Sequence, residues 1–233
     1  MKNLTATAFF CLLSTVAAFA QTAPQVRNVA SFHAVEVSNG IELRLSSGST
    51  QRVVASAEEA DQLDRILTEV RDGVLKISFD REWAETLGLK NVRHMRVDVT
   101  ATSLTALHAS SGAHAEVLGA FTTQGLDVAA SSGGIVKATF ISTDVNAHVS
   151  SGGIATLAGT AQRLDVGASS GGVFKGDGLV ARVCDASASS GGNLSVTVQE
   201  TLTADASSGG DVRYSGSPRV SKRTSSGGSV KSR

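Results

Sequence analysis

The chain has 233 residues, and its 21 lysine and arginine residues balance 21 aspartate and glutamate residues, so its formal net charge is zero. This balance argues against nucleic acid or an anionic membrane as the main partner. Aromatic residues are scarce, with eight Phe, one Trp and one Tyr. We therefore expect a narrow core filled by small and β-branched side chains.

The first 20 residues have the features of a secretory signal peptide. Lys2 supplies a positive start, residues 4–19 are mostly apolar and uncharged, and Ala18-Phe19-Ala20 provides a small-x-small cleavage site. We expect export to the periplasm, the outer envelope or the medium, with residues 21–27 as a flexible N-terminus. No later segment has the ~18 consecutive apolar residues of a transmembrane helix. Cys184 is the only cysteine outside the signal peptide, so no internal disulfide can form.

Residues 28–100 are expected to form an N-terminal β-rich cap together with the first coils of the fold. The runs 32–37 and 41–45 alternate between apolar and polar residues, as half-buried strands do, and Ser46-Ser47-Gly48 is a candidate first corner. Arg71-Asp72-Gly73 separates two further strand-like runs and therefore predicts a hairpin.

Two segments of this region do not resemble strands. Residues 57–63 are the one plausible helical turn. Residues 81–91 are expected to form an exposed loop, and they hold Trp83, the only tryptophan. The Trp83 indole is a candidate platform for a sugar ring or a protein partner. Packing within the cap is the alternative role.

Residues 101–233 contain a repeat with nearly constant spacing. Ser-Ser-Gly occurs seven times, six times with a second glycine, beginning at Ser110, Ser131, Ser150, Ser169, Ser189, Ser207 and Ser225. A fixed period of this size is typical of a solenoid whose coils pack on one another. We predict an all-β fold, a single-stranded parallel β-helix with 18–21 residues per coil, right-handed by the crossover rule.

Apolar residues on both sides of each motif alternate with polar residues. The positions one, three and five residues before the first serine are mostly apolar, as in Ala130, Val128 and Leu126. The position five residues after it is apolar in all seven repeats. This period of two predicts a strand on each side of the motif. Variable connections such as residues 139–144 and 215–219 would then join the coils.

The motif itself is predicted to be a structural corner. Glycine permits a tight turn with positive φ, and the second serine falls on the inward phase of the alternation, where its hydroxyl can bond to like hydroxyls or to backbone. A catalytic serine would instead need a base at one unique place. The expected corner residues are Ser132, Gly133, Gly134, Ser151, Gly152, Gly153, Ser170, Gly171, Gly172, Ser190, Gly191, Gly192, Ser208, Gly209 and Gly210.

Two outward columns of charged residues are candidate interaction surfaces. The column before the corner holds Asp127, Asp165 and Asp185, and the column after it holds Lys137, Lys175 and Arg213. Neighbours within a column lie about 4.8 Å apart. Stacked carboxylates suit calcium, but no second ligand column accompanies them, so calcium is not favoured and no cofactor is predicted. The basic column suits an acidic glycan, and solvated faces are the simpler interpretation of both columns.

The order of these motifs resembles a known family. Phe32-x-x-Val35-x-Val37-x-x-Gly40-Ile41-x-Leu43-x-Leu45, then Val70-x-x-Gly73-x-Leu75-x-Ile77, precede Val97-x-Val99, Leu104-x-x-Leu107 and the repeats. This succession is similar to the "putative auto-transporter adhesin, head GIN domain" family of bacterial envelope or secreted proteins, over about residues 28–230. The expected Gly-Ile-Asn appears here as Gly40-Ile41-Glu42. The resemblance implies a β-helix and supplies no catalytic residues.

We therefore predict an exported, non-enzymatic β-helical protein that acts as an adhesin-like or glycan-interaction module. Its partner would be a surface glycan or an envelope protein, held by many weak contacts along one face. We expect a monomer or weak oligomer. The alternative is a carbohydrate-active enzyme, a polysaccharide lyase or hydrolase, that uses the face of Asp127, Asp165 and Asp185.

Overall fold

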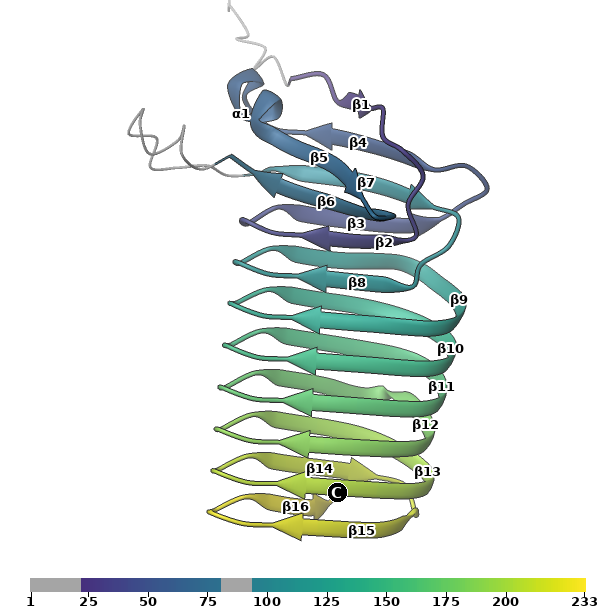
Figure 1. Ribbon diagram of the computed structural model, residues 1–233, viewed down its shortest axis with the longest axis vertical. Helices are drawn as coiled ribbons and strands as arrows, with labels where there is room; N and C mark the ends of the chain where they lie inside the picture. The colour runs from purple at the N-terminus through teal and green to yellow at the C-terminus, as the bar shows by residue number, and fades with distance from the viewer. Residues whose placement is uncertain (1–21, 81–93) are drawn as a thin grey trace, which may run out of the picture.

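The computed structural model describes residues 22–80 and 94–233, and their strands form one wound sheet (Figure 1). The predicted signal peptide and Trp83, with its loop, lie outside the described residues. The elements are β1 (Gln25–Arg27), β2 (Ala34–Val37), β3 (Glu42–Ser47), β4 (Arg52–Ser56), α1 (Ala60–Arg65), β5 (Ile66–Arg71), β6 (Val74–Phe79), β7 (Arg96–Ala101), β8 (Ala106–Ala109), β9 (His114–Ala130), β10 (Ile135–Val149), β11 (Ile154–Ala168), β12 (Val173–Ala188), β13 (Asn193–Ala206), β14 (Asp211–Ser215), β15 (Arg219–Thr224) and β16 (Ser229–Ser232).

The repeat forms the predicted parallel β-solenoid. Each long strand from β9 to β13 leaves one corner, curves around the opposite side of the coil and ends at the next corner (Figure 1). Parallel pairing aligns equivalent residues of successive coils, as in Asn146 with Asp127 and with Asp165. Each coil thus has two flat sides, which we call the pre-corner face, made by the five residues before each corner, and the post-corner face, made by the four residues that begin the next strand.

Residues 139–144 are not the variable connection that the sequence analysis predicted. They lie inside β10 and pair with β11, from Thr139 with Ala158 to Asp144 with Arg163. Continuous pairing around the bend satisfies the backbone amides that a loop would leave to water. Register shifts at the bend, such as those between β11 and β12, accommodate the different coil lengths. The predicted break at residues 215–219 is present between β14 and β15.

The core is the narrow space between the two faces. Val128 and Val136 each expose 1% or less of their surface, as do the equivalent Val166 and Phe174 two coils further on. Most of the other inward positions hold Ala, Val or Leu. In the last coil the inward column holds Lys222, which is exposed. A charged side chain there protects the open end of the sheet from edge pairing.

The Ser-Ser-Gly-Gly segments turn the chain through tight β-turns. In the second repeat Ser132 has φ 48° and Gly133 has φ 74°, and the Gly134 amide donates to the Ser131 carbonyl at 2.8 Å. Two consecutive residues with positive φ and this hydrogen bond define a type I′ turn. The turns stack because the Gly133 amide donates to the Ser151 carbonyl of the next coil at 3.2 Å.

The prediction that the second serine points inward is wrong. Ser132 and its equivalents are exposed, and it is the last glycine of the motif, such as Gly134, that is buried. Two consecutive left-handed residues break the strand alternation on which the prediction relied. The ladder between corners is therefore made by serine carbonyls and not by serine hydroxyls.

The N-terminal region continues the solenoid and then covers it. Asn39 and Gly40, with φ 61° and 75°, form the first corner, and the Gly40 amide donates to the Ser111 carbonyl at 3.1 Å. The corner predicted at Ser46-Ser47-Gly48 is wrong, because Ser46 and Ser47 lie within β3 and none of the three residues has positive φ. Asn-Gly is a preferred pair for a type I′ turn.

Other elements of this region pair antiparallel. The predicted hairpin is present as β5 and β6, with Asp72 and Gly73 at its turn. Gln25–Arg27, which we expected to be flexible, form β1 and pair with β4. The helix α1 lies at the same end of the solenoid (Figure 1).

The two glycines of one corner should respond differently to alanine. A Cβ atom on Gly153 would overlap the Ala130 carbonyl oxygen, whereas one on Gly152 would meet nothing within 4 Å. We predict that Gly153→Ala lowers the free energy of unfolding by at least about 3 kcal/mol. Gly152→Ala should cost only the left-handed penalty of about 1–2 kcal/mol. Urea denaturation of both variants checks this, and equal losses would contradict the packing argument.

Candidate binding groove on the pre-corner face

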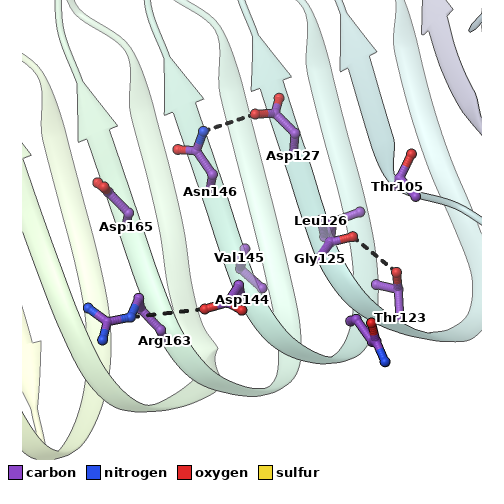
Figure 2. A pocket seen from close by; sticks show the side chains of 11 residues that line it. Thr105, Thr123, Gly125, Leu126, Asp127, Asp144, Val145, Asn146, Arg163 and Asp165 are labelled. Atoms are coloured by element: carbon purple, nitrogen blue, oxygen red, sulfur yellow. Dashed lines mark hydrogen bonds and ion pairs between the residues drawn. The ribbon is translucent and has the colours of Figure 1, made fainter.

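The acidic column before the corners is in register across the coils. Asp127 of β9, Asn146 of β10, Asp165 of β11 and Asp185 of β12 are successive Cα partners. Figure 2 shows the first three in a row across neighbouring strands, pointing away from the core. Because parallel strands lie about 4.8 Å apart, the column repeats a polar side chain at that spacing.

Asp127 is the centre of a small hydrogen-bond network. His108 Nε2 lies 2.7 Å from Asp127 Oδ1, and Asn146 Nδ2 donates to Asp127 Oδ2 at 2.9 Å. Both carboxylate oxygens are thus engaged by side chains of the coils on either side. The contact with His108 does not follow from the alignment of the repeats, because the two residues occupy different columns. They meet diagonally, since β8 pairs with β9.

A second set of charged contacts lies beside the acidic column, on the side nearer the bend of the coil. Arg163 Nε lies 4.0 Å from Asp144 Oδ1, and Arg163 Nη1 lies 3.9 Å from Asp185 Oδ2. All three side chains are more than 45% exposed. Exposed pairs at this distance contribute little to stability. Their effect is to hold one guanidinium beside the acidic column.

These residues border an open groove of about 760 Å³. It is lined by Thr105, Thr123, Gln124, Gly125, Leu126, Asp127, Asp144, Val145, Asn146, Arg163 and Asp165. The groove brings together two of the three predicted carboxylates, Asp127 and Asp165 (Figure 2). Asp185 is on the next strand and is linked to the groove through Arg163.

The predicted basic residues lie on the opposite side of the solenoid, on the post-corner face. Lys137 Nζ donates to Glu116 Oε1 at 2.9 Å, and this hydrogen bond and charge lower the pKa of the Glu116 carboxyl. Arg213 Nη2 donates to Asp211 Oδ2 at 2.6 Å. Lys175 forms no salt bridge with any described residue. The acidic and basic columns therefore cannot contact the same small ligand.

The groove offers hydrogen-bonding groups rather than an assembled catalytic centre. Its hydroxyls come from Thr105 and Thr123, and Thr123 Oγ1 donates to the Gly125 carbonyl at 3.0 Å rather than to a base. Within residues 22–80 and 94–233, no three His, Cys, Asp or Glu side chains are grouped to hold a metal ion. Carboxylate, amide, hydroxyl and guanidinium groups on a rigid sheet suit the reversible binding of a polyhydroxylated chain.

Fold and groove together define a parallel β-solenoid with an open groove on its pre-corner face. Residues 31–218 match the family described as "Putative auto-transporter adhesin, head GIN domain", and the chain belongs to this family. The resemblance inferred from the strand motifs and repeats is thereby confirmed. A comparison with curated proteins found no match.

Solved structures share the fold at low sequence identity. A "putative adhesin" from Bacteroides fragilis is 18% identical, with a TM-score of 0.79 over 91% of this chain and 96% of that one. A "putative lipid binding protein" and a "putative adhesin" from Parabacteroides distasonis give TM-scores of 0.64 and 0.63. They are 18% and 19% identical and cover 90% and 91% of this chain and 96% of each of theirs. None of the described residues belongs to a helix with the length and hydropathy of a membrane span.

Behind the acidic column lies Cys184, fully buried in the core. Burial raises the pKa of its thiol from an ordinary value of 9.0 to about 12, and the charges of Asp185 and Asp165 add to the effect. The folded state therefore retains a proton that the unfolded chain loses above pH 9.0.

We predict that this thiol makes the protein less stable in alkali. Between about pH 9 and pH 12 the free energy of unfolding should fall by about 1.4 kcal/mol per pH unit through Cys184 alone. Chemical denaturation at a series of pH values measures the free energy of unfolding of the Cys11→Ser protein and of the same protein with Cys184→Val. The same dependence of this free energy on pH in the two proteins would contradict the prediction.

Proposed function

We propose that this protein is an exported, non-enzymatic, adhesin-like module that binds a surface glycan through the groove on its pre-corner face. The observation that carries the proposal is the row Asp127, Asn146 and Asp165, presented at a constant spacing in an open groove. Membership of a family described as adhesins supports a binding role. The signal-peptide features of residues 1–20 support export.

A glycan fits the groove better than a protein loop would. Sugar hydroxyls donate and accept hydrogen bonds, and the groove alternates carboxylates with an amide at about 4.8 Å per coil. The lining contains no aromatic side chain, so affinity must come from several polar contacts used together. An open groove also lets a long chain lie across several coils without a free end. An envelope protein that presents a regular polar strand is the other partner this surface suits.

Removing groove side chains should weaken binding without unfolding the protein. We predict that Asn146→Ala and Asp165→Ala each reduce affinity about tenfold, the equivalent of about 1.4 kcal/mol for a lost hydrogen bond to the ligand. Thr156→Ala is the matched control, because Thr156 and Asn146 flank the same corner, which begins at Ser150, but lie on opposite faces. A glycan array followed by titration of the bound glycan measures the effect. Equal binding by all three variants would place the ligand elsewhere.

One geometric observation favours the enzymatic alternative. Asp127 and Asp165 stand two coils apart, about 10 Å from the strand spacing, which is close to the carboxylate separation of inverting glycoside hydrolases. However, both oxygens of Asp127 are engaged by His108 and Asn146. Neither carboxylate faces an enclosed cavity that would exclude water. Binding without turnover is the function these contacts support better.

A degradation assay separates the two functions. We predict no release of reducing sugar or unsaturated product from a panel of neutral and acidic polysaccharides, with or without calcium. Turnover that Asp165→Ala abolishes, while Thr156→Ala leaves it intact, would establish the enzyme and overturn the binding module.

A further inference from the structure

In three successive coils the two faces of the solenoid carry charge patterns that match each other. On the pre-corner face these coils, whose corners begin at Ser131, Ser150 and Ser169, present Asp127, Asn146 and Asp165. On the post-corner face the same coils present Lys137, Thr156 and Lys175, which are also Cα partners in register. Both series therefore run charged, neutral, charged. One is acidic and the other basic. The match is confined to these coils, because Glu116 precedes Lys137 and Ser195 follows Lys175 in the post-corner column.

The matched columns also lie at the same distance from the corner. Asp127 and Lys137 are each five residues from Ser132, the exposed serine of the turn between them. Figure 1 shows the corners stacked along one edge, with the two faces on either side of the solenoid. A second copy in the same orientation can be displaced at right angles to the faces. Its Lys137 column would then lie over the Asp127 column of the first copy.

The register would hold along the whole contact. Both columns repeat at the spacing of the same backbone ladder, about 4.8 Å, so that coils of one copy cannot drift out of step with coils of the other. Lys137 would face Asp127, Thr156 would face Asn146 and Lys175 would face Asp165. The Lys137 side chain is 64% exposed and that of Asp127 is 46% exposed. Each already has partners in its own copy, Glu116 for Lys137 and His108 and Asn146 for Asp127, so the new ion pairs would extend these contacts across the interface.

The neighbouring columns place apolar side chains opposite a mixed column. Nearer the corner, the post-corner face presents Ile135, Ile154 and Val173, outward-facing apolar side chains that are half-buried. The corresponding column of the pre-corner face holds Ala129, the exposed His148 and Gly167, and the His148 imidazole lies against Gly167. Ile135 of one copy would thus cover the small Ala129 of the other, and Ile154 would pack on the His148 ring.

We propose that a second copy of this chain docks its post-corner face on the pre-corner face, with parallel axes and coil against equal coil. The pair keeps one free pre-corner face on one copy and one free post-corner face on the other, so the contact is heterologous and can continue into a lateral stack. Four residues of strand by six coils cover on the order of 400 Å² per copy, below the size of a standard specific interface. Association is accordingly weak and salt-sensitive.

The contact does not depend on the proposed glycan. It uses the same acidic face, so a bound glycan and a second copy would compete for it. Self-association can be measured with purified protein in the absence of glycan. If that measurement failed to show association, the glycan array would still test glycan binding independently.

Charge reversal on each face provides the test. Lys137→Glu/Lys175→Glu makes both faces acidic, and Asp127→Lys/Asp165→Lys makes both basic. We expect the wild-type protein to self-associate in sedimentation equilibrium at low salt, and each double variant alone to lose at least about tenfold in affinity. An equimolar mixture of the two variants should associate again, since their opposite faces then attract.

Asp61→Lys/Asp64→Lys on α1 is the matched control, because it changes the net charge as much as the basic variant does, away from both faces. This control should associate like the wild type, and circular dichroism should show every variant folded. A wild type that stays monomeric at low salt, or a mixture of folded variants that fails to associate, would overturn the proposal.

Discussion

The parallel backbone ladder between coils is the constraint on which the rest of this structure depends. It continues through the corners, where glycine amides bond to serine carbonyls, and around the bend, where β10 stays paired with β11. Because few backbone groups in the repeat are left unpaired by this ladder, each coil must copy the path of the one before. Residues separated by one coil length therefore become neighbours, and every outward position becomes a column with a fixed spacing.

The sequence predicts the solenoid well because period and alternation are properties of the backbone. Seven corners at nearly equal intervals, with inward positions such as Val136 and Leu126, leave little freedom in the cross-section. The direction of the second serine was not predictable by extending that alternation. Ser132 and Gly133 both have positive φ, and a strand rule fails where the chain is no longer extended. Asn39-Gly40 carried the better turn signal at the first corner.

The columns of the candidate site could be predicted from the repeat, but the contacts between columns could not. Alignment on the corners places Asp127, Asn146 and Asp165 in one row without knowledge of the structure. The contact of His108 with Asp127 is diagonal, and it depends on side-chain rotamers. Arg163 lies six residues before its corner, in a part of the coil that looked like a loop because its length varies. Only the continuous pairing at the bend brings it beside Asp185.

A surface built in this way selects ligands by period more than by any single contact. One exposed ion pair or hydrogen bond contributes about 1 kcal/mol or less, which water and salt easily offset. The ladder, however, repeats such groups at a fixed spacing on a sheet that does not have to reorganise on binding. A partner with the same repeat therefore makes every contact after the first at little further entropic cost. A polysaccharide has such a repeat, and so does another copy of the same solenoid. For this fold, the proposed glycan binding and the proposed self-association therefore rest on the same lattice. Both would use the Asp127 column, and only self-association would also use the Lys137 column.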